Sequence, residues 1–282
     1  MKASRISLPG ARTSRAFTLV ELAVVLALLF LGAGMLAHGV ARTAPNVRSV
    51  RCLSNLRRLM AGWQMYANDN QDRLIGVAHG GYIGGGYWAV GWLDWTTSRD
   101  NTNTILLVDP RYATIAPYVN GAADLFNCPA NQYLSTVQRA IGWSQRVRSY
   151  SAQVGMGAGN AEQGPWDALY KHVTKTSDLL HPSPADSTVF VEEHPDSMND
   201  AATFPPHQSY WVDPAATYHN GGCNFGFADG HSGFHRWRGS LMTSFTRQVR
   251  FINVNNSPSA PVGDPDLHWM SFHTQRVSTN SY

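Results

Sequence analysis

The sequence predicts an α+β protein in which a long N-terminal α-helix packs on an antiparallel β-sheet. Three observations support this fold class. An apolar run covers residues 17–40, a stripe of apolar residues follows over 47–67, and short strand patterns bounded by turn residues come much later. Apolar residues at every third or fourth position are typical of an amphipathic helix, whereas alternation between turn signals is typical of strands.

Composition limits the classes of function that the chain can have. Its 282 residues allow one large domain or two small ones, and 43% hydrophobic with 15% charged residues can bury a core. The net charge of +3 is too small to indicate a nucleic-acid partner. Four of the basic residues precede the apolar run: Lys2, Arg5, Arg12 and Arg15. The rest of the chain is therefore about neutral, which is typical of an ordinary solvated surface.

The apolar run at residues 17–40 is long enough to cross a membrane. As a helix its 24 positions would extend about 36 Å, against a hydrocarbon core of about 30 Å. The run contains one acidic residue, Glu21. A carboxylate at such a position is costly and usually has a function. A cleaved secretory signal and a plain membrane anchor both fit the run, but neither requires Glu21.

The helix is expected to continue beyond the apolar run, over residues 41–68. Pro45 predicts an interruption, because proline lacks a backbone donor and kinks or breaks a helix. The segment "NDNQD" predicts the end of the helix near residue 68. The residues expected to face the rest of the protein are Val47, Val50, Leu53, Leu56, Met60, Trp63 and Ala67.

Residues 69–250 are predicted to form a globular α+β head, and 251–282 an irregular C-terminal tail rich in Pro, Ser and Asn. The segment "HGGYIGGGYWAVGWLDWTTS" favours aromatic packing with glycine turns over an aromatic surface for glycans or another subunit. One strand is expected at Thr188–Val191. Three cysteines without a CxxC motif leave room for one disulfide and one free thiol.

The segment "HNGGCNFGFADGH" predicts a β-hairpin over residues 219–237. Phe225 and Phe227 alternate along the first strand, and Asp229-Gly230 is a strong two-residue turn signal. His219 comes just before that strand. We expect a hydrogen bond from its ring to Asp229 or to a turn carbonyl, which would stabilise the hairpin.

The string "RAFTLVEL" resembles the processing signal of type IV prepilins and type II secretion pseudopilins. That family has a basic leader, a small residue and then Phe-Thr-Leu-(Ile/Val)-Glu. The resemblance implies a pilin-like fold, a leader at residues 1–16 that a prepilin peptidase cleaves between Ala16 and Phe17, and N-methylation of Phe17. It places Glu21 at mature position five as the assembly carboxylate. Glycine is usual before the cleavage site, so Ala16 departs from the pattern.

Two further features resemble large pseudopilin-like proteins of the planctomycete and verrucomicrobia type. His219, nine residues and Asp229-Gly230 resemble the H-x9-DG motif of proteins with prepilin-type signals. In that group a helix cysteine recurs together with the cysteine of an F-x-C-P segment. The resemblance therefore implies a disulfide between Cys52 and Cys128, with two reduced buried thiols as the alternative.

The resemblance implies a structural subunit and no catalytic residue. Its implied partners are the prepilin peptidase and other pilin or pseudopilin subunits. Its implied location is the bacterial inner membrane, as a single-pass protein with a cytoplasmic N-terminus and a periplasmic head, followed by assembly into a pilus or pseudopilus filament.

Metal sites belong to the alternatives. Major type II pseudopilins carry a structural Ca²⁺, and Asp196, Asn199 and Asp200 offer oxygen ligands. The D-x-D-x-D-G pattern is missing, which favours a solvated acidic turn. The competing function is a membrane-anchored extracytoplasmic enzyme or glycan-binding protein with a metal site around His219 and Asp229. Its candidate zinc ligands are His219, Asp229, His231 and His235, with Glu192 or Glu193.

Overall fold

The computed structural model describes residues 18–159, 169–207, 209–244, 248–252 and 259–277, without the side chains of residues 30–46. The chain divides into two units, residues 1–44 and 45–282. The predicted leader at residues 1–16 and the predicted cleavage site at Ala16 and Phe17 lie outside the described residues.

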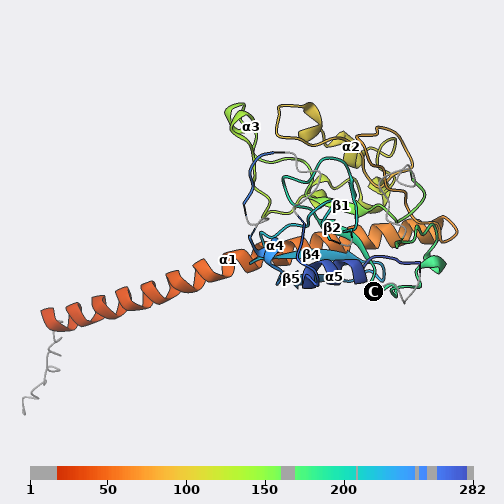
Figure 1. Ribbon diagram of the computed structural model, residues 1–282. Helices are drawn as coiled ribbons and strands as arrows, with labels where there is room; N and C mark the ends of the chain where they lie inside the picture. The colour runs from red at the N-terminus through yellow and green to blue at the C-terminus, as the bar shows by residue number, and fades with distance from the viewer. Residues whose placement is uncertain (1–17, 160–168, 208, 245–247, 253–258, 278–282) are drawn as a thin grey trace, which may run out of the picture. The chain divides into compact units, whose positions relative to one another are not determined.

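The first helix, α1, extends over Leu19–Asp69 (Figure 1). The predicted end near residue 68 is confirmed. The predicted interruption at Pro45 is wrong, since α1 continues through this residue. Proline removes only one hydrogen bond, so a helix can continue through it with a local distortion. The boundary between the two units nevertheless falls between Ala44 and Pro45.

None of the helices in the described part of the chain combines the length and the apolar character that crossing a membrane requires. The side chains of residues 30–40, which belong to the predicted apolar run, lie outside the described residues.

The second unit is an α+β structure built on a five-stranded sheet, so the predicted fold class is confirmed at that level. The strand order is β3-β1-β2-β4-β5, and the strands are β1 (Tyr150–Gln153), β2 (Thr188–Glu192), β3 (Ala202–Thr203), β4 (Gly222–Phe227) and β5 (Ser232–Arg236). The short helices that accompany them are α2 (Ile105–Val108), α3 (Thr136–Ala140), α4 (Ser240–Ser244) and α5 (Pro265–Phe272). Within the described residues, 3-10 turns lie at Arg99–Asn101, Ala116–Val119, Ala123–Phe126 and Thr176–Asp178.

The expectation of a purely antiparallel sheet is wrong, because β3 pairs with β1 in parallel. β2 is antiparallel to β1, and its last residue, Glu192, lies opposite Tyr150 at the start of β1. The chain leaves β2 beside that start and reaches the free edge of β1 through a short loop. It then continues in the same direction as β1, with Ala202 opposite Ala152.

The two faces of the sheet pack against different helices. On β4, Cys223, Phe225 and Phe227 belong to an apolar cluster that includes residues of α4 and α5. Gly226 points to the other face, where its backbone lies against Met60 of α1. Successive side chains of a strand point to opposite faces, so this alternation places the sheet between α1 and the C-terminal helices.

The buried face of α1 differs from the predicted one. Leu56, Met60, Trp63 and Ala67 are buried as predicted, but Val47 and Val50 are each 65% exposed. The face that packs on the head begins at Cys52 and continues through Leu56 and Leu59. Val47 and Val50 precede Cys52 by five and two residues, which at 3.6 residues per turn places them on the far side of the helix.

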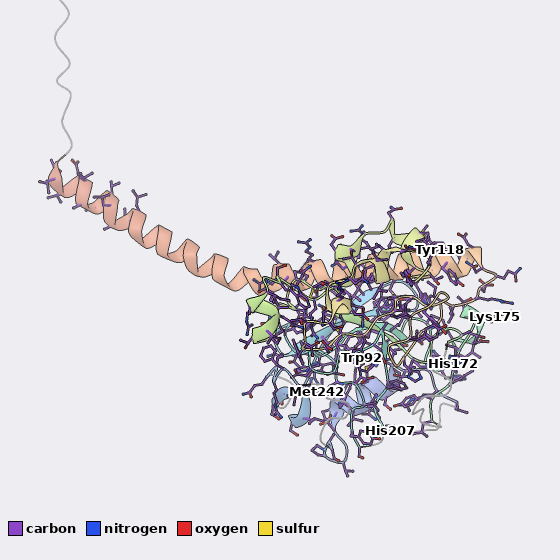
Figure 2. The ribbon with its side chains drawn as sticks, turned by 90° about the horizontal axis from the view of Figure 1, so that it is seen from above. Trp92, Tyr118, His172, Lys175, His207 and Met242 are labelled. Carbon is purple, nitrogen blue, oxygen red and sulfur yellow. A yellow bond between two sulfur atoms is a disulfide. The ribbon has the colours of Figure 1, made fainter. Side chains whose placement is uncertain are left out.

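Aromatic side chains pack the head against α1 and the sheet. Tyr118 lies beside α1 (Figure 2). Its ring meets the Tyr66 ring of α1 edge-on, with ring centroids 5.7 Å apart. Trp88, from the glycine-rich segment, is 1% exposed and stacks on Phe126. The glycine-rich segment thus contributes to the core, as its sequence favours.

The C-terminal part of the chain forms the predicted hairpin but also contains a helix that was not predicted. The hairpin is confirmed, since β4 and β5 pair antiparallel and Gly230 has a φ of 97° in the turn. The predicted irregular tail is wrong over α5. Asp264 caps this helix by accepting from the backbone N–H groups of Asp266 and Leu267 at 3.0 and 3.1 Å, and Pro265 occupies its first turn.

Gly226→Val is expected to destabilise the second unit by about 1–3 kcal/mol. A Cβ atom at this position would lie 2.9 Å from Met60 Cγ and 3.1 Å from its Sδ, and Met60 is fully buried. Urea unfolding of Gly226→Val measures the effect. Met60→Ala in the same background should return part of the loss, because it opens space at the same contact. Strict additivity of the two substitutions would contradict this packing.

Candidate functional site

Glu21 lies in the first turn of α1 and forms a capping box with Thr18. Glu21 Oε2 accepts hydrogen bonds from the Thr18 backbone N–H and from Thr18 Oγ1, both at 2.8 Å. The Glu21 backbone N–H donates back to Thr18 Oγ1 at 3.3 Å. These bonds satisfy N–H groups that a helix start leaves without partners. Glu21 therefore has a partner within its own chain before any second chain is considered.

The residues around Glu21 are apolar and exposed. Between Leu19 and Leu29, eight large apolar side chains have exposed fractions of 44% or more: Leu19, Val20, Leu22, Val24, Val25, Leu26, Leu28 and Leu29. A contiguous apolar surface of this kind marks an interaction site with lipid or protein.

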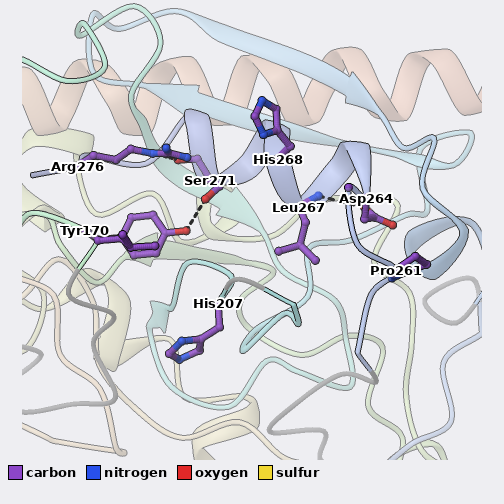
Figure 3. Close-up of a pocket in the computed structure, with 10 residues that line it drawn as sticks. Tyr170, His207, Pro261, Asp264, Leu267, His268, Ser271 and Arg276 are labelled. Atoms are coloured by element: carbon purple, nitrogen blue, oxygen red, sulfur yellow. Dashed lines mark hydrogen bonds between the residues drawn. The ribbon is translucent and has the colours of Figure 1, made fainter. Parts of the chain in front are cut away.

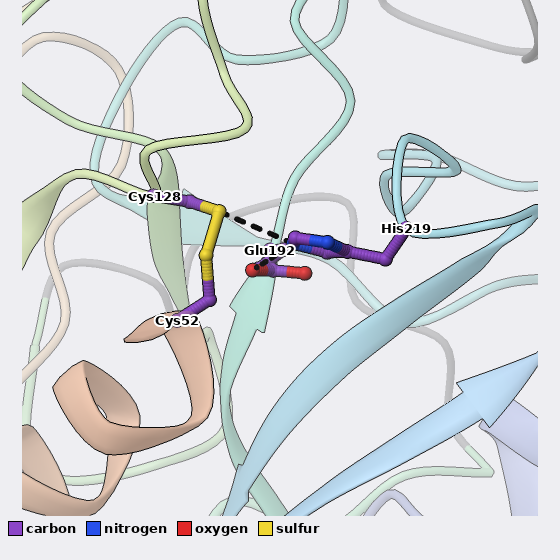
Figure 4. Close-up of side chains that lie close together, drawn as sticks. All are labelled: Cys52, Cys128, Glu192 and His219. Atoms are coloured by element: carbon purple, nitrogen blue, oxygen red, sulfur yellow. Dashed lines mark hydrogen bonds and ion pairs between the residues drawn. A yellow bond between two sulfur atoms is a disulfide. The ribbon is translucent and has the colours of Figure 1, made fainter. Parts of the chain in front are cut away.

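His219, the first residue of the segment "HNGGCNFGFADGH", lies in a buried cluster that is drawn in Figure 4. Its Nε2 atom lies 3.0 Å from Glu192 Oε1 and 3.2 Å from Cys128 Sγ. Glu192 is the last residue of β2 and is 0% exposed, and its Oε2 accepts from the Asn224 backbone N–H at 2.8 Å. The imidazole thus joins the end of β2 to the loop that carries Cys128.

The disulfide beside His219 is the pair that the resemblance implies. Cys52 of α1 and Cys128 are bonded, and both are fully buried. Asn55, one turn after Cys52, donates to the Asn127 carbonyl at 3.1 Å and supports the same contact. Cys223 is the remaining free thiol, also buried, and its sulfur donates to the Glu192 carbonyl at 3.2 Å.

The local sequence explains how His219 reaches this cluster. Asn220 and Gly221 both have positive φ, 52° and 76°, and the backbones of His219 and Gly222 bond each other in both directions. Two consecutive residues in the left-handed region form the tight turn that Asn-Gly sequences favour. The turn directs the His219 side chain to the buried start of β4.

The expected bond between His219 and Asp229 is wrong. The two residues lie at opposite ends of β4, whose six residues extend about 20 Å. Asp229 Oδ1 instead contacts His231 Nδ1 at 2.6 Å in an exposed pair, and His235 lies 3.7 Å from Asp266. The alternative zinc site around His219 and Asp229 is therefore not assembled.

The calcium candidates serve the fold. Asp196 accepts from the backbone N–H groups of Arg250 and Ile252 at 2.6 and 3.2 Å. Asp200 accepts from Gly80 and Ala202, and Asn199 Oδ1 accepts from the Asp200 N–H at 2.5 Å. Asp196 and Asp200 are buried, so the predicted solvated acidic turn is wrong as well. Backbone donors occupy the oxygens that would otherwise bind Ca²⁺.

A second buried polar network continues from Glu193. This carboxylate accepts from Ser151 and, at 2.7 Å, from Ser197, whose hydroxyl also lies 3.4 Å from Asp213. Arg148 is fully buried and donates to Ser151 Oγ at 2.8 Å. Burial raises the pKa of Glu193 to about 7, against the hydrogen bonds of the two serines and the charge of Arg148, and it raises the pKa of Asp213 well above its ordinary range.

The free energy of unfolding is expected to fall as the pH rises from about 4.5, the ordinary pKa of Glu193, to about 7 in the folded chain. Over this interval the folded chain keeps a proton that the unfolded chain has lost, so protonation favours the fold. Glu193→Gln should reduce the fall, leaving the part that the raised pKa of Asp213 contributes, and should raise stability at pH 8 by about 3 kcal/mol. Urea midpoints at pH 5 and pH 8 measure it, with the exposed Asp69→Asn as control. An unchanged pH slope in Glu193→Gln would contradict this assignment.

A pocket of about 460 Å³ opens beside α5 (Figure 3). Its volume suits a small ligand. Its polar groups also make internal bonds: Tyr170 OH lies 2.7 Å from Ser271 Oγ, Arg276 Nε donates to the Ser271 carbonyl, and Asp264 caps α5. Its wall consists of Leu169, Tyr170, His207, Pro261, Gly263, Asp264, Leu267, His268, Ser271 and Arg276.

Comparison of the chain with known protein families, with curated proteins and with solved structures gives no match.

Sequence reasoning missed the capping box and named the partner of His219 only within a larger set. The capping box could have been found, because Thr18 and Glu21 have the T-x-x-E spacing ahead of an apolar run. Glu192 was one of the candidate zinc ligands named with His219, but no local signal distinguished it from Glu193, since 27 residues separate Glu192 from His219 in the sequence.

Proposed function

We propose that the chain is a prepilin-like structural subunit, processed by a prepilin peptidase and assembled through α1 into a type II secretion pseudopilus or type IV pilus-like filament. The observation that carries the proposal is the start of α1. Eight exposed apolar side chains surround one carboxylate, Glu21, in the position that the prepilin resemblance assigns to it.

Exposed apolar side chains in this number require contact with lipid or with another protein chain, which removes them from water. Lipid provides it while the subunit is held in the inner membrane by residues 17–40, with the N-terminus in the cytoplasm and the head in the periplasm. Neighbouring subunits provide it after assembly. Within the second unit, Val47 and Val50 are each 65% exposed on the side of α1 away from the head, and they offer further apolar side chains to a neighbour.

Within the head, the residues of α1 from Cys52 onward support the same role. One face of this part of α1, with Cys52, Leu56 and Met60, is buried in the core of the head, and Cys52 is bonded covalently to Cys128. A helix attached in this way can be packed by other subunits without separating from its own head. The α+β class of the head is compatible with a pilin-like fold.

Glu21 would set the register between subunits. In the proposed filament its carboxylate meets the N-methylated amine of Phe17 on a neighbouring chain. Removing either member of a buried ion pair is strongly destabilising, since it leaves an uncompensated charge. The amine would share Glu21 with the Thr18 hydrogen bonds, because a carboxylate has about four lone-pair sites and Glu21 Oε1 is outside the capping box.

Mass spectrometry of the mature N-terminus is expected to find N-methyl-Phe17 as the first residue. Cleavage after Ala16 is the step on which the proposed function depends, and inactivation of the prepilin peptidase should leave residues 1–16 attached. A mature start near residue 38 or 45 would instead indicate a secretory signal and would refute the proposal.

A further inference from the structure

Four side chains with metal-binding atoms meet at the disulfide, and they come from four separate segments. Cys52 belongs to α1, Cys128 follows the 3-10 turn Ala123–Phe126, Glu192 ends β2 and His219 precedes β4 (Figure 4). One ligand atom of each lies within 4.8 Å of the others, and all four residues are buried. Among the described residues, this is the group of Cys, His, Asp and Glu side chains that converges this closely.

We propose that reduction of the Cys52–Cys128 bond converts this cluster into a tetrahedral Zn²⁺ site with two thiolate ligands, one imidazole and one carboxylate. Thiolate, imidazole and carboxylate are the ligands of protein-bound zinc, and thiolates select zinc over Ca²⁺ or Mg²⁺. This inference does not depend on the proposed filament role.

Two of the distances within the cluster, both at His219, already approach those of a zinc site. With metal–ligand bonds of about 2.0–2.3 Å, neighbouring ligand atoms of a tetrahedral site lie about 3.3–3.8 Å apart. His219 Nε2 lies 3.2 Å from Cys128 Sγ and 3.0 Å from Glu192 Oε1. Each separation needs to grow by only a few tenths of an ångström, so His219 can keep its position.

The surrounding hydrogen bonds hold one ligand ready. Glu192 Oε2 accepts from the Asn224 backbone N–H at 2.8 Å, while Oε1 faces His219 Nε2 and also accepts from Asn224 Nδ2 at 3.3 Å. A ligand carboxylate fixed in this way by a backbone donor is a common feature of metal sites, where such partners orient the ligands. The fold thus supplies the orientation before any metal arrives.

The conversion needs a dithiol reductant. One thiolate of the reductant attacks a sulfur of the Cys52–Cys128 bond and forms a mixed disulfide, and its second thiol releases the cysteine and leaves as a cyclic disulfide. Two electrons pass to the protein, and the reductant is oxidised. Zn²⁺ then displaces the protons of both cysteine thiols, which go to solvent. A disulfide oxidant reverses the sequence by thiol–disulfide exchange: it accepts the two electrons and is reduced to its dithiol, the Cys52–Cys128 bond forms again, and Zn²⁺ returns to solvent. α1 is therefore linked to Cys128 in either state.

The test uses the full chain in detergent, reduced with dithiothreitol, desalted without oxygen and titrated with Co²⁺ as the spectroscopic probe. We expect one Co²⁺ per reduced chain with a thiolate-to-cobalt charge-transfer band, displaced by Zn²⁺, and no such band in the oxidised chain. His219→Ala and Glu192→Gln should each weaken binding by about tenfold or more. Cys223→Ala is the matched control and should bind as the unmodified chain does, because Cys223 lies outside the cluster.

Several results would overturn the proposal: no charge-transfer band in the reduced chain, a band that persists in the Cys52→Ser, Cys128→Ser double variant, or a band lost in Cys223→Ala. Equal affinity in His219→Ala would exclude the imidazole as a ligand and would count against it as well. If reduction alone unfolds the head, zinc should restore the circular dichroism spectrum, and failure to do so would also refute the site.

Discussion

Cys52→Ala is expected to lower the free energy of unfolding of the unit at residues 45–282 by about 4 kcal/mol. The bond to Cys128 closes a loop with a sequence separation of 76 residues, and closing a loop of that size restricts the unfolded chain by about 4–5 kcal/mol in the chain-entropy account. The lost sulfur also leaves a small void at a position with no solvent exposure. Both effects act in the same direction.

Urea unfolding with and without dithiothreitol measures this loss. The reductant should lower the midpoint of the unmodified chain and leave that of Cys52→Ala unchanged. Cys223→Ala removes a thiol of equal burial without opening a loop, and it should remain sensitive to the reductant. A midpoint in Cys52→Ala equal to that of the unmodified chain would show that the disulfide contributes little to stability.

The second large effect is expected at Glu21. Glu21→Gln should be cleaved normally but should reduce filament assembly by at least tenfold, because glutamine keeps the capping hydrogen bonds and loses the charge that the Phe17 amine needs. Thr18→Ala makes the opposite change. It removes the hydroxyl of the cap, worth about 1 kcal/mol at a helix start, and keeps the carboxylate.

The two variants separate the roles of Glu21. Counting of sheared filaments, with immunoblots of total and processed subunit, gives assembly per processed chain. We expect Thr18→Ala to assemble nearly as well as the unmodified chain. Equal losses in both variants would indicate that Glu21 acts through the cap, and normal assembly of Glu21→Gln would refute the charge mechanism.

The sequence predicts the elements better than their mutual arrangement. The alternation of Phe225 and Phe227 with the Asp229-Gly230 turn was sufficient for the hairpin, because strand and turn are set by neighbouring residues. The parallel pairing of β3 could not be predicted, since Ala202 and Thr203 are too few to show a period. The error at Val47 and Val50 arises because apolar residues occur on both sides of α1, and only the contact with the head shows which side is buried.

The candidate sites also differ in how far their environments can be predicted from the sequence. Glu21 lies in a local string that can be read residue by residue, and its capping partner is three positions away. His219 depends on Glu192 and Cys128, which are 27 and 91 residues distant, so its environment follows only from the completed sheet. Asp229 was paired with His219 on the basis of a motif, but a motif records spacing along the chain. Because β4 is extended and lies between His219 and Asp229, the two residues are far apart in space.

The position of the disulfide has a mechanical consequence. Over residues 47–69, the C-terminal part of α1, Cys52 is the first fully buried residue. In a filament pulled along its axis, force would enter each head through α1 and would pass at Cys52 into Cys128 and the sheet. The remaining turns of the helix, from Leu53 to Asp69, would lie behind that link and carry little load. The head could then resist extension without peeling its own helix from the core.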